Sequence, residues 1–310
     1  MMFKMDTEAI NMLVESQLAI WPDAKRNYDA LALTDRKRLR VGNLEAFVQH
    51  NPARITSTGA KIDAASIKKR PCFLCKANRP AEQLCGEWIP SWELLVNPYP
   101  ILPIHFTIVN TFHRPQDGIP LEMAVMAEKA PDLAIFYNGA KAGASAPDHR
   151  HCQAVLKSEL PLLKLAEKHH LPGMPPIISS EKFGLDLPFN FLSAIVTPDR
   201  EGGITLQTMT LVKGVDGQTG KPDSGLVNAF FWISDTGYLR IIVIPRKAHR
   251  PECYSAEDET QMTVSPGALD MAGIMIMPVR KDYDRMNPEL AEKIYGEVAF
   301  KGSIPPEVLS

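Results

Sequence analysis

The chain lacks several features that would place it in an easily recognised class of protein. No uninterrupted apolar run approaches the ~20 residues that a helix needs to span a bilayer. The N-terminus, Met-Met-Phe-Lys-Met-Asp-Thr-Glu, is charged and lacks the apolar segment of a signal peptide. The five cysteines are an odd number in a long chain and do not suggest a disulfide framework. We therefore expect a cytoplasmic protein with no membrane partner.

The chain also lacks a strong charge of either sign. Its formal net charge is −2, so no overall basic field exists that would attract nucleic acid. It does contain 45% hydrophobic and 23% charged residues, a composition typical of a globular protein with a real core. Its 310 residues suffice for one large domain or two ordinary ones. We expect no nucleic-acid partner, and any nucleotide must be held by a local site.

The most informative stretch is residues 138–153, Asn-Gly-Ala-Lys-Ala-Gly-Ala-Ser-Ala-Pro-Asp-His-Arg-His-Cys-Gln. Apart from a lysine, residues 139–145 carry little side-chain bulk, so their backbone N–H groups can approach an anion closely. His149, His151 and Gln153 follow at intervals of two, and in an extended segment such side chains point to the same face. A nucleophilic histidine that faces a phosphate-binding loop is what transfer of a nucleotidyl group requires.

This stretch resembles the histidine-triad (HIT) superfamily, in the transferase branch where glutamine replaces the third histidine of the triad. Galactose-1-phosphate uridylyltransferases, dinucleoside tetraphosphate phosphorylases and GDP-hexose phosphorylases carry versions of it. The resemblance implies a double displacement at the α-phosphorus of a nucleotide, with His151 as the nucleophile and Gln153 stabilising charge in the transition state. It also implies a set of substrate-binding residues in the loop, namely Asn138, Lys141, Gly143 and Ser145.

A second motif, Cys72-Phe73-Leu74-Cys75, has the Cys-x-x-Cys spacing at which two thiolates can bind one tetrahedral metal. It could also be a redox motif, but no thioredoxin-like pattern surrounds it. Uridylyltransferases carry a similar segment, and the resemblance implies a structural zinc ion bound by Cys72, Cys75, His113 and His149. His105 is the rival to His113 for the third place, because many triad proteins have a histidine at the start of the corresponding strand.

Hydrophobic patterning and turn residues predict the elements of an α+β fold. We expect helices over residues 7–20, 119–130 and 288–296, and a loop, in which short strands are possible, over residues 50–71. We expect strands at Trp92–Val96, Ile104–Asn110, Leu133–Asn138 and from the motif to Leu156, then at Phe191–Val196, Thr205–Val212, Ala229–Ser234, Leu239–Ile244 and Gly273–Pro278.

The resemblance implies two tandem HIT-like halves, with mostly antiparallel sheets and packed helices. The catalytic half with the zinc site would span residues 1–165, a connector residues 166–187, and a half without the catalytic motif residues 188–310. His-Arg-Pro occurs after a β-rich run in both halves, at His113 and at His249. This faint repeat is either a coincidence or a trace of two copies of one unit.

The donor stays open at this point, because the resemblances differ. Cys72 and Cys75 favour nucleotide sugars and sugar phosphates, the spacing from Gly143 to His149 favours dinucleoside polyphosphates, and residues 265–273 resemble GDP-hexose phosphorylases. Some relatives are dimers, so a homodimer is one expectation. The alternative to an enzyme is a catalytically silent, zinc-stabilised nucleotide-binding module.

Overall fold

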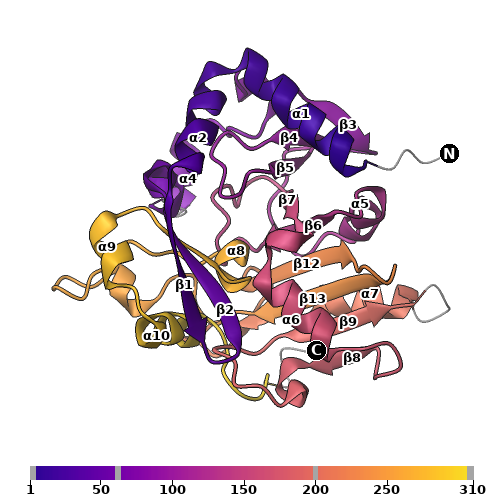
Figure 1. The fold of residues 1–310 in the computed structure, drawn as a ribbon, viewed down its shortest axis with the longest axis vertical. Coiled ribbons are helices and arrows are strands. Elements are labelled where there is room, and N and C mark those ends of the chain that lie inside the picture. Colours follow the sequence, from indigo (N-terminus) through magenta and orange to yellow (C-terminus); the bar gives the residue numbers. More distant parts are fainter. Residues whose placement is uncertain (1–4, 60–63, 198–201, 306–310) are drawn as a thin grey trace.

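A computed structural model describes residues 5–59, 64–197 and 202–305 of the chain (Figure 1). These residues form an α+β fold around one nine-stranded sheet, and every strand pair in that sheet is antiparallel. The prediction of an α+β fold with mostly antiparallel sheet is therefore confirmed. In spatial order the strands are β3 (Gly86–Ile89), β4 (Trp92–Val96), β5 (His105–Asn110), β7 (His151–Leu156), β6 (Leu133–Asn138), β12 (Val227–Ile233), β13 (Leu239–Pro245), β9 (Leu192–Val196) and β8 (Ile177–Ser179).

Two smaller sheets accompany the large one. One contains β1 (Asp35–Val41), β2 (Leu44–His50) and β14 (Ile274–Met277), where β14 runs parallel to β2, and the other pairs β10 (Gly214–Val215) with β11 (Pro222–Asp223). The helices are α1 (Thr7–Ile20), α2 (Pro22–Ala32), α3 (Ile55–Thr58), α4 (Ala64–Lys69), α5 (Met123–Lys129), α6 (Pro161–His169), α7 (Gly202–Leu211), α8 (Ala268–Met271), α9 (Arg280–Arg285) and α10 (Pro288–Val298). Short 3-10 turns are η1 (Pro52–Arg54), η2 (Lys76–Asn78), η3 (Lys157–Glu159), η4 (Ser180–Phe183) and η5 (Glu252–Tyr254).

The large sheet contains the same strand arrangement twice. Inward from the edge strand β3 the order is β4-β5-β7-β6, and from the other edge inward it is β8-β9-β13-β12. In each set the last two strands in chain order are reversed in space, so that β7 precedes β6 and β13 precedes β12. The two sets meet where β6 pairs with β12. The sheet thus has the pattern expected of two related units, although it is continuous across them. The boundaries proposed from the sequence remain predictions.

The central pair of the β6–β12 ladder, Phe136 and Phe230, gives the correspondence between the two sets. Phe136 pairs with Gln153 on β7, and Phe230 pairs with Ile242 on β13. Arg240, two residues before Ile242, therefore occupies the position that corresponds to His151, two residues before Gln153. Since β13 corresponds to β7, the His-Arg-Pro segment after β13 does not correspond to the one after β5. The His-Arg-Pro repeat in the sequence is therefore a coincidence and not a trace of two copies of one unit.

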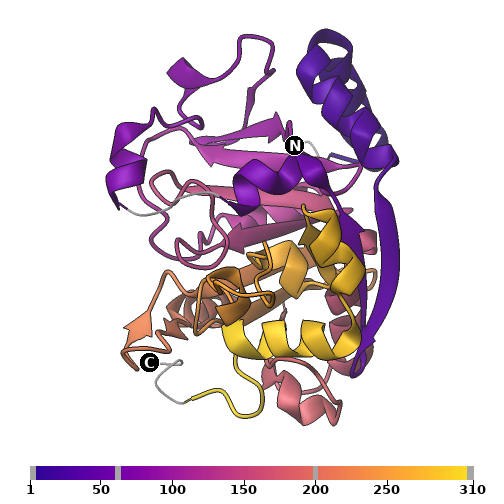
Figure 2. The ribbon, with the colours of Figure 1, turned by 90° about the vertical axis from the view of Figure 1, so that its left-hand side faces the viewer.

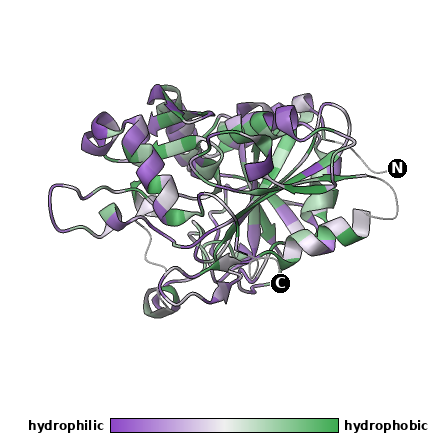
Figure 3. Ribbon diagram, turned by 90° about the horizontal axis from the view of Figure 1, so that it is seen from below, coloured by the Kyte–Doolittle hydropathy of each residue, from purple (hydrophilic) through white to green (hydrophobic). Residues whose placement is uncertain are grey.

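Helices cover both faces of the large sheet. Ile10 and Val14 of α1, Met126 of α5 and Met209 of α7 are buried with the residues of one face, whereas α6, α8 and α10 pack with those of the other. The ribbon of β1 and β2 runs along one side of the molecule (Figure 2). Coloured by hydropathy, the strands at the centre are largely apolar (Figure 3). None of the described helices has the length and apolar character needed to cross a bilayer.

Two expectations about secondary structure are wrong. Residues 205–211 of the predicted strand lie in α7 instead, because Thr205 and Met209 lie four residues apart and bury one helical face beside β9. Residues 50–71, expected to form a loop, begin with the last residue of β2, and the described positions after it contain η1, α3 and α4 and no strand. In contrast, the helix predicted over residues 7–20 has those bounds, with the Asp6 carboxylate accepting a hydrogen bond from the N–H of Ala9.

Candidate functional site

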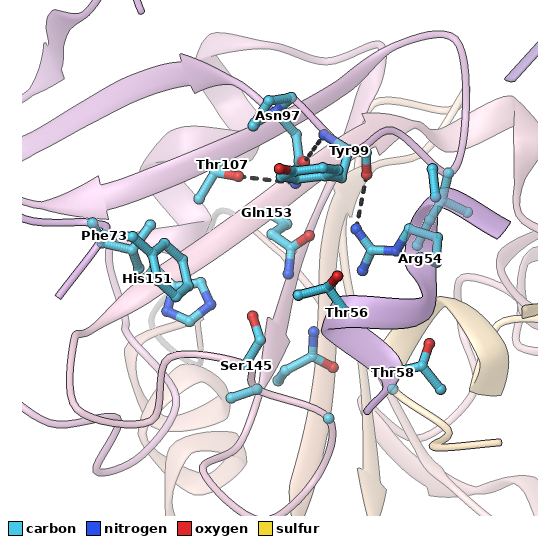
Figure 4. Close-up of a pocket in the computed structure, with 18 of the residues that line it drawn as sticks. Arg54, Thr56, Thr58, Phe73, Asn97, Tyr99, Thr107, Ser145, His151 and Gln153 are labelled. Carbon is cyan, nitrogen blue, oxygen red and sulfur yellow. Dashed lines mark hydrogen bonds between the residues drawn. The ribbon is translucent and has the colours of Figure 1, made fainter. Parts of the chain in front are cut away.

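A cavity of about 960 Å³ lies over the face of the large sheet where β7 begins. His151 and Gln153 of β7 line it, together with Ser145 and Gly143 of the preceding loop. Figure 4 shows these side chains opposite Thr56 and Arg54, which come from the segment after β2. Residues that follow β13 in the chain complete the lining, among them His249, Arg250, Ser265 and Gly267. Both parts of the chain therefore contribute to one site.

The imidazole of His151 is held in one protonation state and one orientation. Its Nδ1 lies 2.7 Å from the carbonyl oxygen of His149, so Nδ1 carries the proton and donates it. The Nε2 lone pair is left for the cavity that the ring lines. Burial lowers the pKa of His151 from 6.5 to about 4, with the hydrogen bond to His149 opposing the shift. The ring is therefore neutral near pH 7, as a nucleophile must be.

Gln116 fixes the start of β7, and no sequence signal pointed to it. Its side-chain amide donates hydrogen bonds to the carbonyls of His151 (2.9 Å) and Asn138 (3.0 Å). Its Oε1 accepts the backbone N–H of His151 at 3.0 Å. One buried side chain thus clamps the first residue of β7 to the last residue of β6. Only the three-dimensional fold brings this residue beside the motif.

His149 does not share the cavity with the other two motif residues. It precedes β7, and its ring enters a cluster with Cys72, Cys75 and His113, so the expectation that all three side chains line one surface is wrong. Nδ1 of His149 lies 3.3 Å from Sγ of Cys72 and 3.5 Å from Sγ of Cys75. Nδ1 of His113 lies 3.2 Å from Sγ of Cys75. All four candidate ligand atoms lie within 4.8 Å of one another.

His105 is not part of this cluster. Its Nε2 lies 2.8 Å from Oε1 of Gln153, and its Nδ1 accepts the N–H of Ile101 at 3.1 Å. The rival assignment of His105 as a metal ligand is therefore wrong. The histidine at the start of β5 bonds to the third residue of the motif instead, and it does so from a position with no exposed surface.

The loop before the motif touches the second strand set through glycine. Gly143 has a φ of +97°, and a Cβ placed there would lie 2.4 Å from the Cα of Gly267. A side chain at Gly143 would separate the two backbones, so this approach requires glycine there. The loop is thereby docked against the segment that leads into α8.

Asn138 anchors the same contact by hydrogen bonds. Its Oδ1 accepts the N–H of Ala268 at 2.7 Å and the side-chain amide of Asn228 at 3.1 Å. Asn228 also donates to the carbonyl of Ala142, and Arg246 donates to Oδ1 of Asn228 at 2.6 Å. This buried network joins β6, the loop, β12 and the segment before α8. The geometry gives Asn138 a role in shaping the loop, and its predicted role in substrate binding stays a prediction.

The predicted loop residues have different surroundings. Ser145 lines the cavity, and its carbonyl accepts a hydrogen bond from Arg70. Lys141 does not line the cavity and forms an ion pair with Asp223 at 2.6 Å instead. The structure thus brings together His151, Gln153, Gly143, Ser145 and the backbone held by Asn138, but leaves Lys141 outside.

Basic side chains that the sequence did not single out also line the cavity. Arg70 pairs with Asp148 at 2.9 Å and stacks on Phe73, while its Nη1 is buried without a hydrogen-bond partner among the described residues. Arg250 donates to Ser265 Oγ at 3.0 Å and to the Thr58 carbonyl at 3.1 Å. Arg54 donates to the carbonyl of Tyr99 at 2.8 Å. Such a lining favours an anionic ligand.

Comparison with known proteins identifies the fold. A family model described as a domain of unknown function (DUF4922) matches residues 13–156. The crystal structure of yeast Ap4A phosphorylase Apa2 in complex with AMP is 15% identical, covers 99% of this chain and 100% of its own, and has a TM-score of 0.62. A second structure of that enzyme is 16% identical over 92% and 96%, with a TM-score of 0.56. Its complex with Ap4A is 13% identical over 91% and 98%, with a TM-score of 0.55. No curated protein sequence matches the chain.

Replacing Asn138 with alanine tests the network beneath the loop. The N–H of Ala268 then loses its acceptor in a buried place, which typically costs about 1–3 kcal/mol. Urea unfolding should show a loss of unfolding free energy in that range. Asn43→Ala is the matched control, because the Oδ1 of Asn43 also accepts one backbone N–H, that of Asp186, but at an exposed site. Water can replace that bond, so equal losses in the two variants would contradict the account.

Proposed function

We propose that the chain is a nucleotidyltransferase or phosphorylase that forms a covalent nucleotidyl-histidine on His151. One observation carries this proposal: a buried, neutral histidine has Nδ1 bonded to a backbone carbonyl and lines a large cavity that arginines also line. A silent binding module has no need of a nucleophile prepared in this way. The yeast enzyme with the same fold is a phosphorylase of Ap4A, which supports the same reaction class for this chain.

The reaction has two displacements at the α-phosphorus. In the first, the Nε2 lone pair of His151 forms a P–N bond, the P–O bond to the leaving group breaks, and the leaving group departs as an anion. The ring then bears a positive charge, which the His149 carbonyl stabilises through the proton on Nδ1. In the second, an oxygen of the acceptor phosphate attacks phosphorus and the P–N bond breaks. The electron pair returns to Nε2, so the histidine is restored.

The surroundings of His151 suit the charges of such substrates. Ser145 and the small-residue loop lie on one side of the cavity, and Arg70 and Arg250 reach it from separate segments. Guanidinium groups bind phosphate oxygens through several N–H groups at once. We propose a dinucleoside polyphosphate as the first candidate donor, because it carries several phosphates. A nucleotide sugar with a sugar-phosphate acceptor is the second candidate, favoured by the Cys72–Cys75 motif.

We further propose that Cys72, Cys75, His113 and His149 hold a structural zinc ion. Tetrahedral bonds of about 2.0–2.3 Å place neighbouring ligand atoms about 3.5 Å apart, and the sulfur–nitrogen distances here are 3.2–3.5 Å. Nε2 of His149 faces the carbonyl of Asn110 at 2.8 Å, which fixes the proton there and directs Nδ1 at the metal. Four protein ligands leave no open position. The ion would supply a rigid anchor for His149 and thus for its carbonyl.

The cytoplasmic location and the homodimer remain predictions.

Incubation with a panel of donors tests the proposed reaction. Ap4A and other dinucleoside polyphosphates, and nucleoside diphosphate sugars, are each supplied with inorganic phosphate or a sugar phosphate, and the products are separated by chromatography. At least one donor should be consumed by the wild type and by His169→Ala, whose histidine lies on α6 and stacks on Phe183. His151→Ala should lose transfer while its Tm stays close to that of the wild type. Transfer at the wild-type rate by His151→Ala would refute the proposed nucleophile, and binding without turnover of any donor would support a binding module.

Loss of one cluster thiol tests the metal. The purified wild type should contain about one zinc ion per chain by elemental analysis. Cys75→Ser should contain far less and should melt several degrees lower, because metal binding at a closed site contributes to folding. Transfer should slow as well, since His149 loses its anchor. Cys85→Ser is the control, because Cys85 is exposed and outside the cluster. Equal zinc content and equal Tm in the two variants would remove the case for this site.

A further inference from the structure

His105 is an unexplained feature next to the proposed site. It is the first residue of β5, its side chain has no exposed surface, and it faces neither the metal cluster nor solvent. A buried polar group that uses all its hydrogen-bonding capacity can be structural. His105 differs in one respect, because the short contact of its Nε2 is with the side chain of Gln153. That partner is the residue proposed to contact the reacting phosphate.

The backbone determines which nitrogen of His105 carries the proton. The N–H of Ile101 points at Nδ1 over 3.1 Å, so Nδ1 must offer a lone pair. A neutral ring then has its proton on Nε2. Burial is the main cause that lowers the pKa of His105 to about 3, and the positive charge of Arg54 adds to it. The ring therefore stays neutral, and Nε2 is a donor.

This tautomer in turn determines how the amide of Gln153 lies. Nε2 of His105 donates to Oε1 of Gln153 at 2.8 Å, so the oxygen end of the amide faces the histidine. The NH₂ end is then free to face the cavity, as Figure 4 shows for Gln153. A rotated amide would place its NH₂ group against the N–H of His105. Two donors would meet, which disfavours that orientation.

A second amide, that of Asn97, lies near Nε2 of His105 and has partners of its own. Its Oδ1 accepts the N–H of Tyr99 at 2.9 Å, which directs its Nδ2 to Oγ1 of Thr107 at 3.1 Å. Thr107 is the direct partner of Gln153 across the β5–β7 ladder. Nδ2 of Asn97 also lies 3.5 Å from Nε2 of His105. A lone pair on Nε2 could accept from it, but the N–H of Ile101 already requires the lone pair on Nδ1.

We propose that His105 is a positioning residue that presents the NH₂ group of Gln153 to the reacting phosphate. This inference rests on the proposed function for its catalytic consequence, although the hydrogen-bonded geometry stands without it. An amide held in this way donates to a non-bridging oxygen as charge develops there, with no reorientation at the moment of reaction. An amide free to rotate spends part of its time with its oxygen toward the phosphate, where it repels.

The first test compares variants of His105 and Gln153. His105→Phe keeps a ring of similar size and removes both nitrogens, whereas His105→Gln retains an amide donor. We expect His105→Phe and Gln153→Ala each to lower kcat by about 10²–10³, the typical cost of losing one preorganised donor, with little change in KM. The double variant should be no slower than the slower single variant, because both remove one interaction. His105→Gln should recover at least about tenfold over His105→Phe.

His170 provides the matched control. It is also buried with both nitrogens engaged, at 2.9 Å from Ser193 Oγ and 2.9 Å from the carbonyl of Pro175, but it does not line the cavity. Ser193 pairs with Ile242 on β13, as Thr107 pairs with Gln153 on β7. His170→Phe should lower Tm and leave kcat unchanged. Equal losses of kcat in His105→Phe and His170→Phe would overturn the proposal. So would a loss in the double variant His105→Phe, Gln153→Ala that equals the product of the two single losses.

A second measurement does not need turnover or a variant that folds. Long-range proton–nitrogen NMR spectra of the wild type at neutral pH should show His105 as the Nε2–H tautomer, with Nδ1 unprotonated. The opposite tautomer would refute the positioning role outright. If the wild type turns over no donor while His105 has the expected tautomer, the proposed function fails and the geometric part of this inference holds. Turnover unaffected by His105→Phe would refute this inference and leave the proposed function intact.

Discussion

The hydrogen bond between Nδ1 of His151 and the carbonyl of His149 is the interaction on which the site depends. It fixes the proton on Nδ1 and leaves the Nε2 lone pair to the cavity, and in the proposed reaction it would offer a partner for the positive charge of the intermediate. A carbonyl can do this only if its own residue cannot move. The ring of His149 is held between two thiols and the carbonyl of Asn110, and Gln116 clamps the backbone of His151 itself. Under the proposed function, a cluster away from the cavity would thus control the chemistry within it.

The two strand sets have the same arrangement and different uses. In the first, β7 faces a cavity. In the second, the corresponding face is filled, because Leu163 and Ala166 of α6 pack with Ile242, and His170 beyond α6 hydrogen-bonds Ser193. The second set contributes instead through its ends, since β12 and the segment before α8 support the small-residue loop of residues 139–145 by way of Asn228 and Gly267. Both strand sets are therefore needed to form the one site, the first through the face of β7 and the second through the support of the loop.

Patterns of neighbouring residues in the sequence predicted the elements whose structure depends mainly on neighbouring residues. The helix over residues 7–20, the strand at Trp92–Val96 and the cluster of Cys72, Cys75, His113 and His149 follow from spacing and resemblance, and the structure contains them. Gln116 and Arg250 could not be found in this way, because strand register and loop packing bring them to the site from distant positions. The sequence singles out His105 only as a rival metal ligand, and its bond to Gln153 depends on the register of β5 and β7. Thr205–Val212 has the β-branched composition of a strand, yet packing of Thr205 and Met209 against the sheet makes it a helix. The side chain of His149 does not line the surface predicted for it, because β7 begins two residues later, at His151.

The most direct test of the account is to locate the covalent intermediate on one residue. The protein is incubated with a donor but no acceptor, digested at mildly alkaline pH, where a phosphorus–nitrogen bond to histidine survives, and analysed by tandem mass spectrometry. Trypsin cleaves after Arg150 and after Lys157, so peptide 151–157 contains His151 and no other histidine, whereas peptide 142–150 contains only His149. We predict the added nucleotidyl mass on peptide 151–157. A nucleotidyl group on peptide 142–150 or on any other peptide, or turnover by a reaction that retains no nucleotidyl group on the protein, would contradict the central claim.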